Sequence, residues 1–281
     1  MNRKYEFTGE RCDWMNRKYE FTGETKNWIG RKLHRIRAVR DFGDVKAGDL
    51  GGWIEKERNL SHDGDAWVYG NARVYGNAEV YGNARVYGNA EVYGNAKVYG
   101  NARVYGNAEV YGNARVYGNA EVYGNAWVRC NAWVYGDAWV YGDARVSDNA
   151  KVYGDAEVYG DAWVYGNAWV YGDARVSGNA KVSGNAEVYG RKHILWISMI
   201  GSRDDTVTFM RAKDEKIIVA VGCFGGTIDE FEKAVEETHG DNEHGKAYSL
   251  VIELAKLRID LHKEEEDDTE TGEEEKEEGC F

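Results

Sequence analysis

The chain has 281 residues, no proline and a net charge of −12. Most of that charge lies in residues 263–281, which hold 2 basic and 11 acidic residues. No apolar run approaches the roughly 18 residues that a membrane-spanning helix needs, and no broad basic excess marks a nucleic-acid binder. These totals argue against a membrane-spanning protein and against a protein that binds nucleic acid.

The cysteines and the first residues suggest a cellular compartment. Cys12, Cys130, Cys223 and Cys280 lie far apart and form no CxxC pair. Such spacing predicts neither a disulfide framework nor a zinc site. The first residues also lack the apolar core of a signal peptide. We therefore expect a protein of the reducing cytoplasm.

Residues 1–64 predict an N-terminal cap and a lead-in coil. Residues 1–14 duplicate residues 15–28, which indicates a gene rearrangement or an early start codon, although a functional double strand is the alternative. The basic stretch 31–40 is interpreted as an amphipathic strand with solvated arginines rather than as a phosphate-binding strand. The spacing of six between Ile54, Leu60 and Ala66 predicts an irregular first coil, and Phe42 and Trp53 are expected to plug its open end.

A six-residue repeat, of the form D-A-W-V-Y-G or N-A-E-V-Y-G, then fills residues 65–190 with 21 hexads and no insertion. A strict period of this kind predicts a left-handed parallel β-helix with three hexads per triangular coil, and therefore seven 18-residue coils. Strand alternation points Ala and Val inward, and the variable residue and Tyr outward. Gly-Asn turns each corner, because both residues tolerate positive φ. Where Cys130 and Asp148 replace Gly, we expect the following asparagines to adopt the positive φ.

The lead-in resembles a known family. The residues that carry the resemblance are K-Y-E-F-T-G-E-T at Lys18–Thr25 and L-H-R-I-R-A-V-R-D-F-G-D-V-K-A-G-D-L-G-G-W-I-E at Leu33–Glu55. They are similar to the lead-in of bacterial and prophage hexapeptide-repeat proteins, which are often labelled acyltransferases or polymer-forming proteins. The resemblance covers residues 15 to about 262 and implies a left-handed β-helix. It brings no catalytic residue to this chain.

The period stops after Gly190, and residues 191–262 predict a small α+β domain that closes the far end of the β-helix. Strands are expected at 193–200, 206–211 and 216–224, with a hairpin turn at Asp214–Glu215. The last of these strands leads into two helices, and residues 263–281 are expected to form a disordered acidic tail.

The first helix is expected over residues 227–239. Thr227 and Glu230 form a capping box at its start, and Gly240 ends it. The second helix is expected over residues 246–261. Its leucines share one face, which indicates an amphipathic helix: Leu250, Leu254, Leu257 and Leu261.

The outward positions of the repeat hold the candidate site. Residues 18 apart should stack, which places Arg145 between Trp127 and Trp163, and Lys151 between Trp133 and Trp169. Outward tryptophans indicate an interface, because aromatic residues are enriched there, although fortuitous ladder stacking is the alternative. The binding or interface candidates are Trp127, Trp133, Trp139, Trp163, Trp169, Arg145 and Lys151.

The repeat offers no group suited to catalysis. All six histidines lie outside it, and only His62 and His193 flank it closely enough to serve a site on a coil. Stacked aspartates such as Asp137, Asp155 and Asp173 are interpreted as turn formers rather than as calcium ligands. We assign no catalytic residue, no metal ion and no cofactor.

Two functions stay open at this point. The first is a non-catalytic β-helical scaffold or binding rod, encoded by a prophage, that associates with itself (for example as a trimer) or with an unidentified protein. The second is an acyl-CoA-dependent acyltransferase of the hexapeptide-repeat type, with its site between subunits. The uniform repeat favours the first function, since catalysis needs a few groups held in a special geometry.

Overall fold

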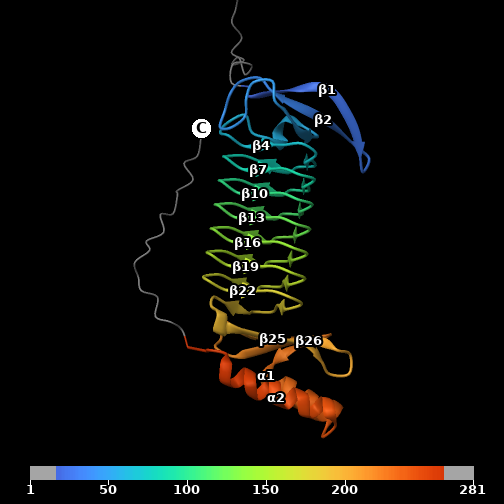
Figure 1. Cartoon of the computed structure of the whole chain (residues 1–281), viewed down its shortest axis with the longest axis vertical. Coiled ribbons are helices and arrows are strands. Elements are labelled where there is room, and N and C mark those ends of the chain that lie inside the picture. The colour runs from blue at the N-terminus through green and yellow to red at the C-terminus, as the bar shows by residue number, and fades with distance from the viewer. Residues whose placement is uncertain (1–16, 263–281) are drawn as a thin grey trace, which may run out of the picture.

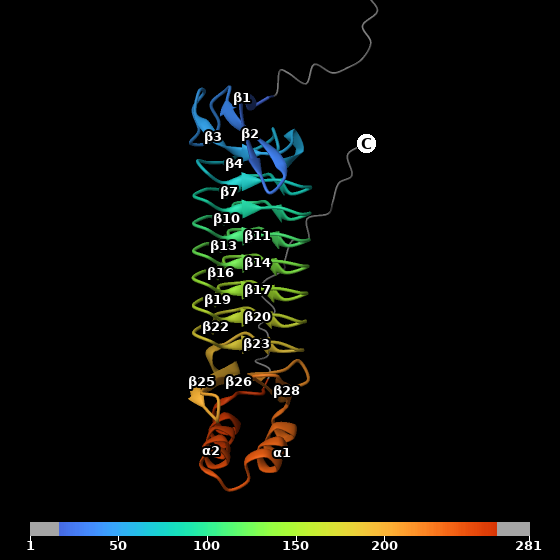
Figure 2. The same cartoon turned by 90° about the vertical axis from the view of Figure 1, so that its right-hand side faces the viewer.

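The structure is a computed structural model that describes residues 17–262; the duplicated segment 1–14 and the acidic tail 263–281 lie outside the described residues. A triangular rod of stacked coils forms the body of the molecule (Figure 1). A hairpin covers one end of the rod, and a small sheet with two helices covers the other (Figure 2). None of the helices within residues 17–262 is long and apolar enough to cross a membrane.

The coils consist of two-residue strands, and each strand pairs in parallel with the strand 18 residues away. We name the three faces of the rod after their first strands. The β5 face contains β5 (Arg73–Val74), β8 (Glu91–Val92), β11 (Glu109–Val110), β14 (Trp127–Val128), β17 (Arg145–Val146), β20 (Trp163–Val164) and β23 (Lys181–Val182). The β4 face contains β4 (Trp67–Val68), β7 (Arg85–Val86), β10 (Arg103–Val104), β13 (Glu121–Val122), β16 (Trp139–Val140), β19 (Glu157–Val158) and β22 (Arg175–Val176). The β6 face contains β6 (Glu79–Val80), β9 (Lys97–Val98), β12 (Arg115–Val116), β15 (Trp133–Val134), β18 (Lys151–Val152), β21 (Trp169–Val170) and β24 (Glu187–Val188).

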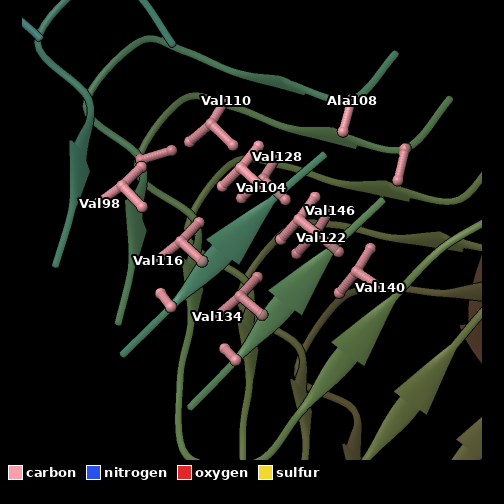
Figure 3. Packing of buried hydrophobic residues seen from close by; sticks show 14 of the residues in the cluster. Val98, Val104, Ala108, Val110, Val116, Val122, Val128, Val134, Val140 and Val146 are labelled. Atoms are coloured by element: carbon pink, nitrogen blue, oxygen red, sulfur yellow. The ribbon is translucent and has the colours of Figure 1, made fainter. Parts of the chain in front are cut away.

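The core of the rod is a column of valines edged by alanines (Figure 3). Every alanine and valine of the repeat is buried, and the variable residue beside each valine is exposed or half-buried except Trp67, which the N-terminal end covers. Main-chain hydrogen bonds join the coils: the Glu109 N–H donates to the carbonyl of Ala126 at 2.9 Å. The predicted parallel β-helix with seven 18-residue coils is therefore confirmed.

The tyrosines of the repeat form stacked ladders, which we did not predict. The rings of Tyr99, Tyr117 and Tyr135 are nearly parallel, with centroids 4.8 and 4.9 Å apart. This distance equals the spacing between neighbouring strands, so the ladder follows directly from the coil register. Burial in the ladder raises the pKa of Tyr117 to about 12.

Each corner needs one residue with positive φ, and the prediction for two corners was wrong. Cys130 and Asp148 themselves take the glycine conformation, with φ of +59° and +61°. The reason is the hydrogen-bond ladder. The Asn131 N–H donates to the carbonyl of Asp148 at 2.8 Å, and a positive φ at the asparagine would turn this donor away.

Cys130→Gly is therefore expected to stabilise the rod. A residue with a Cβ in the left-handed region costs about 1–2 kcal/mol, whereas glycine costs about 0.5–1 kcal/mol in lost chain entropy. The expected net gain in the free energy of unfolding is about 0.5 kcal/mol. Cys130→Val should instead destabilise the rod, because a β-branched residue fits this region worst. Urea unfolding of the two variants checks the sign of each change, and the same sign for both would contradict the assignment.

The N-terminal end contains three longer strands. β1 (Tyr19–Trp28) and β2 (Arg31–Ala38) form an antiparallel hairpin, and β2 also pairs antiparallel with β3 (Leu50–Ile54). β3 then pairs in parallel with β5, so it begins the first coil. A 3-10 turn, η2 (Glu57–Asn59), follows.

The irregular first coil is confirmed, but its spacing differs from the expectation. Ile54 pairs with Val74, and Leu60 with Val80, so this coil is two residues longer than the others. Ala66 does not continue the series of Ile54 and Leu60; it occupies the alanine position before Val68. The two extra residues lie between Leu60 and Val68.

The plug of this end differs from the prediction in one residue. Phe42 is buried in the main core, and its ring lies 5.3 Å from the ring of Trp67. Trp53 is also buried, but it packs outside the rod against Leu33 and Tyr75. It pairs with Arg73, an outward position, so the hairpin of β1 and β2 covers it from outside.

The basic strand carries paired rather than free arginines. Arg31 pairs with Glu55 at 3.0 Å, and Arg37 pairs with Glu20. Arg35 lies 3.9 Å from Glu24. These arginines therefore hold the hairpin to its own acidic neighbours.

The C-terminal end is a layered cap. A short turn, η3 (Arg191–His193), leads to an antiparallel sheet of β25 (Ile194–Ile200), β26 (Asp205–Arg211), β27 (Ile217–Val221) and β28 (Phe224–Thr227). One face of this sheet extends the valine core through residues such as Met210 and Ala220, and the other packs on the helices. We predicted a single strand over 216–224, but a turn at Gly222–Cys223 divides it into β27 and β28.

The helices are α1 (Ile228–His239) and α2 (Glu243–Arg258). The capping box of α1 is confirmed: the side chain of Thr227 accepts from the Glu230 N–H, and the Glu230 carboxylate accepts from the Thr227 N–H. α2 begins three residues earlier than predicted, because Asn242 caps it, and it ends three residues earlier. Its buried face contains Tyr248, Ile252 and Ala255, and not the leucines.

Candidate binding surface

The five selected tryptophans lie on the outside of the C-terminal half of the rod. Trp127, Trp133 and Trp139 belong to consecutive strands, one on each face, so they form a belt around a single coil. Trp163 and Trp169 follow two coils later on the β5 and β6 faces. Trp139 is 45% exposed, and the other four are half-buried against their neighbours.

On the β6 face the predicted stacking of Lys151 occurs on both sides. Its ammonium lies 5.2 Å from the ring of Trp133 and 4.8 Å from that of Trp169. Arg115 lies over the other side of Trp133 at 4.9 Å. Lys213, in the turn between β26 and β27, lies 3.5 Å from the ring of Trp169. We call this series of five side chains the cation–aromatic column.

The cations of the column are available to a partner. Arg115, Lys151 and Lys213 form no ion pair within residues 17–262. Burial, with the nearby charge of Lys151, lowers the pKa of Lys213, although Glu187 opposes this shift. Exposed contacts between a cation and an indole are worth about 0.5–1 kcal/mol each, so the indoles help to hold the cations of the column in place.

On the β5 face the stacking is one-sided. The register places Arg145 between Trp127 and Trp163, as predicted, and Arg145 lies 5.1 Å from the ring of Trp127. Trp163 does not stack on Arg145. Its Nε1–H donates to Ser147 Oγ at 3.3 Å, and its ring tilts against Tyr165. Ser147 replaces a tyrosine of the repeat, and the indole covers the space that this smaller side chain leaves.

A cleft of about 550 Å³ adjoins Trp163, where the β5 face meets the turn between β25 and β26. Its walls include Trp163, Arg145 and Lys181 from the rod, Asp204 from the turn and Asp205 at the start of β26. The cleft therefore combines one aromatic wall with charges of both signs. Sequence reasoning missed it, because the turn is 38 or more residues away from the rod residues Arg145 and Trp163.

The N-terminal half of the rod has a different surface. Its outward residues are charged, and several pair between coils: Arg73 with Glu91 at 2.8 Å, Lys97 with Glu79 at 3.1 Å, and Arg103 with Glu121 at 3.0 Å. These charges therefore satisfy one another. The tryptophan-bearing half also contains such a pair, Arg175 with Glu157 at 3.0 Å, but adds five outward indoles to the surface.

The two histidines beside the repeat have structural contacts. His62 Nδ1 accepts the Lys18 N–H at 3.3 Å, and its ring stacks on Tyr19 at 4.3 Å. Burial lowers the pKa of His62. His193 is buried, and its Nδ1 accepts the Tyr189 N–H at 3.3 Å. In each ring, the Nδ1 acceptor is occupied by the main chain.

We also searched the described residues for metal-binding clusters and bridged cysteines. Within residues 17–262, no three His, Cys, Asp or Glu side chains gather in a way that could hold a metal ion. At the corners, Asn119 and Asn125 donate to Asp137 and Asp143 at 2.9 Å, so these aspartates continue the asparagine ladders. Cys130 and Cys223 are exposed and unbridged.

A second hollow, of about 290 Å³, lies within the C-terminal cap. Its lining includes Phe231 and His239 of α1, Tyr248 of α2 and Cys223 of the turn before β28. Burial raises the pKa of Tyr248, and the nearby carboxylate of Asp205 adds to the shift. None of the residues selected from the sequence lines this hollow.

Comparison with known proteins bears on the repeat. Residues 66–80, 78–94, 96–112, 108–124 and 114–130 match a family described as "YdcK Beta solenoid repeat". A relative from Escherichia coli (strain K12), "Uncharacterized acetyltransferase YdcK", is 49% identical over 37 residues. That stretch covers 13% of this chain and 11% of the relative's length. With the coil geometry, these matches show that part of the repeat is similar to a bacterial β-solenoid repeat family.

Proposed function

We propose that this chain is a non-catalytic β-helical rod that binds a partner protein through its tryptophan-bearing half. The observation that supports this proposal most directly is the cation–aromatic column, in which Trp133 and Trp169 alternate with three cations that form no ion pair within residues 17–262. Tryptophan and arginine are enriched among the residues that dominate protein interfaces. The chemistry of the column suits a partner segment with acidic and apolar side chains.

The regular coils support a binding role. The outward side chains are held at fixed intervals by the ladder of coils, so a partner meets a preorganised surface and loses little entropy in ordering it. The ion-paired half of the rod serves as spacer in this proposal. The belt of Trp127, Trp133 and Trp139 extends the contact to all three faces.

The experiment compares two sets of five substitutions in the full chain. One changes the tryptophans to serine: Trp127, Trp133, Trp139, Trp163 and Trp169. The matched control changes five outward charged residues of the upstream coils to serine: Glu79, Lys97, Arg103, Glu109 and Glu121. Both sets leave the valine core intact, and circular dichroism checks the fold.

Partners captured from the native cell extract by the immobilised wild type are identified and then quantified on each variant. We expect the control to capture the partners as the wild type does. The tryptophan variant should capture at least tenfold less of each partner. Rising salt should also weaken capture, because exposed charges are screened. Equal retention by the two variants would contradict the proposal.

The alternative is an acyl-CoA-dependent acyltransferase, which the printed name of the relative favours. Such an enzyme needs a base within hydrogen-bond reach of its substrate. His62 and His193 are the histidines nearest the coils, and their Nδ1 atoms accept main-chain N–H groups. This arrangement supports the binding rod over the transferase.

A further inference from the structure

The outer face of α2 carries an apolar stripe of Leu250, Leu254 and Leu257. These side chains are 68%, 40% and 83% exposed. At 100° per residue, Leu254 lies about 200° around the helix from Ile252, which packs in the core of the cap. The stripe therefore points away from the sheet. Large exposed apolar side chains that gather on one face mark an interaction surface.

The stripe lies at the tip of the molecule. The two helices form the last layer beyond the sheet of β25 to β28 (Figures 1 and 2). The same outer side of α1 is polar, with Lys233, Glu236 and Glu237 exposed. The apolar character is therefore specific to α2 and is not a general feature of this end.

The composition of the acidic tail does not suit an apolar cover. Residues 263–281 hold 11 acidic residues, and only Cys280 and Phe281 are apolar. Residues 1–16 join the described chain at the opposite end of the rod (Figure 1). Within residues 17–262 these leucines stay exposed, so another molecule can cover them.

The spacing of the stripe favours a second copy of this chain. The leucines are four and then three residues apart, which is the d-a-d spacing of a coiled-coil seam. A seam of this kind is complementary to itself. In the same heptad frame Glu253 is a g position and Arg258 an e position, and neither forms an ion pair within residues 17–262. In parallel paired helices, a g residue faces the e′ residue of the next heptad on the partner.

We infer that two copies of this chain associate tip to tip, with α2 packed against α2 of the second copy in parallel. The leucines fill the seam, and Glu253 of each copy pairs with Arg258 of the other. Because the helices lie across the end of the rod, the two rods point in opposite directions. The dimer is therefore about twice as long as one chain. This contact is separate from the tryptophan-bearing half. The inference does not depend on whether that half binds a partner.

The first test measures the mass and length of the full chain. Sedimentation equilibrium gives the dissociation constant, and small-angle X-ray scattering gives the maximum dimension. We expect a dimer nearly twice as long as the monomer. Leu250→Ser with Leu257→Ser should raise the dissociation constant at least tenfold. The matched control, Lys233→Ser with Glu236→Ser on α1, should leave it unchanged.

The second test separates the seam from a general loss of apolar surface. Glu253→Arg should weaken the dimer, because it places two cations together. Adding Arg258→Glu should restore the dimer, since the pair is then reversed. A monomer at all concentrations, a dimer of unchanged length, or a dimer that survives the leucine substitutions would overturn the inference. Failure of the charge reversal to restore association would overturn the parallel register.

Discussion

Val110→Asp is expected to lower the free energy of unfolding by several kcal/mol, on the order of 4. Val110 is fully buried and pairs with Val92 and Val128 on the coils to either side; Figure 3 shows Val110 and Val128 in the core. A carboxylate there would meet only apolar side chains, so it would have to stay unpaired or take up a proton. Thermal and urea unfolding, followed by circular dichroism, measure the change.

Glu109→Gln is the matched control, one residue away on the outer surface. The Tyr93 hydroxyl donates to Glu109 Oε2 at 2.9 Å, and the amide oxygen of glutamine can accept the same bond. We expect this variant to change the free energy of unfolding by less than about 0.5 kcal/mol. Equal shifts of the melting temperature in the two variants would refute the assignment of inward and outward positions.

Glu187→Ala is expected to cost about 3–5 kcal/mol, because it leaves the guanidinium of Arg211 buried without a partner. Arg211 lies in β26 of the cap and is fully buried, and Glu187 lies in β24 of the last coil. Their side chains pair at 2.9 Å, and Arg211 also lies over the ring of Tyr189. Only Nη1 bonds to the carboxylate, and Arg211 Nε and Nη2 are buried without a hydrogen-bond partner, so removing Glu187 leaves the guanidinium without its acidic partner.

Two comparisons show whether burial causes the effect. Glu79→Ala removes a carboxylate from the half-exposed pair with Lys97 and should cost less than about 1 kcal/mol. Glu187→Leu with Arg211→Met replaces the buried pair by apolar groups and should recover most of the loss. Urea unfolding gives the energies, and amide exchange in β24 to β26 locates the change. A cost at Glu187 no larger than that at Glu79 would contradict a role of the pair in holding the cap.

The rod could be predicted from the sequence because the six-residue period determines the length of each coil. A repeat of six residues fixes three strands per coil, so residues 18 apart must stack. The positions of Trp133, Lys151 and Trp169 on one face follow from this alone. The direction of an indole does not follow, since it depends on its neighbours. Trp163 turns toward Ser147, and no pattern of outward residues predicts that turn.

Apolar residues at a spacing of six predicted the wrong pairing in the first coil, where the repeat is irregular. The spacing from Leu60 to Ala66 matched the repeat by coincidence, and only the pairing of Leu60 with Val80 shows the longer first coil. At the corner of Cys130, the residue type favours a positive φ at the following asparagine, whereas the corner geometry favours it at Cys130. The hydrogen bonds of the next asparagine decide which residue takes the positive φ.

The cap was predictable in its elements and not in its packing. Local signals located both helices, since capping residues act within one turn. They could not show that α2 buries Ile252 rather than Leu254, because both sets of residues are apolar and the choice depends on the sheet above. The cleft beside Trp163 joins the rod to the turn at Asp204 and required the folded chain.

The most direct test of a non-catalytic role is calorimetric titration of acetyl-CoA into the full chain, at concentrations where a second copy and any site between subunits are present. We expect no saturable heat. Saturable binding that is lost on changing His62 or His193 would contradict the binding rod and establish the transferase instead.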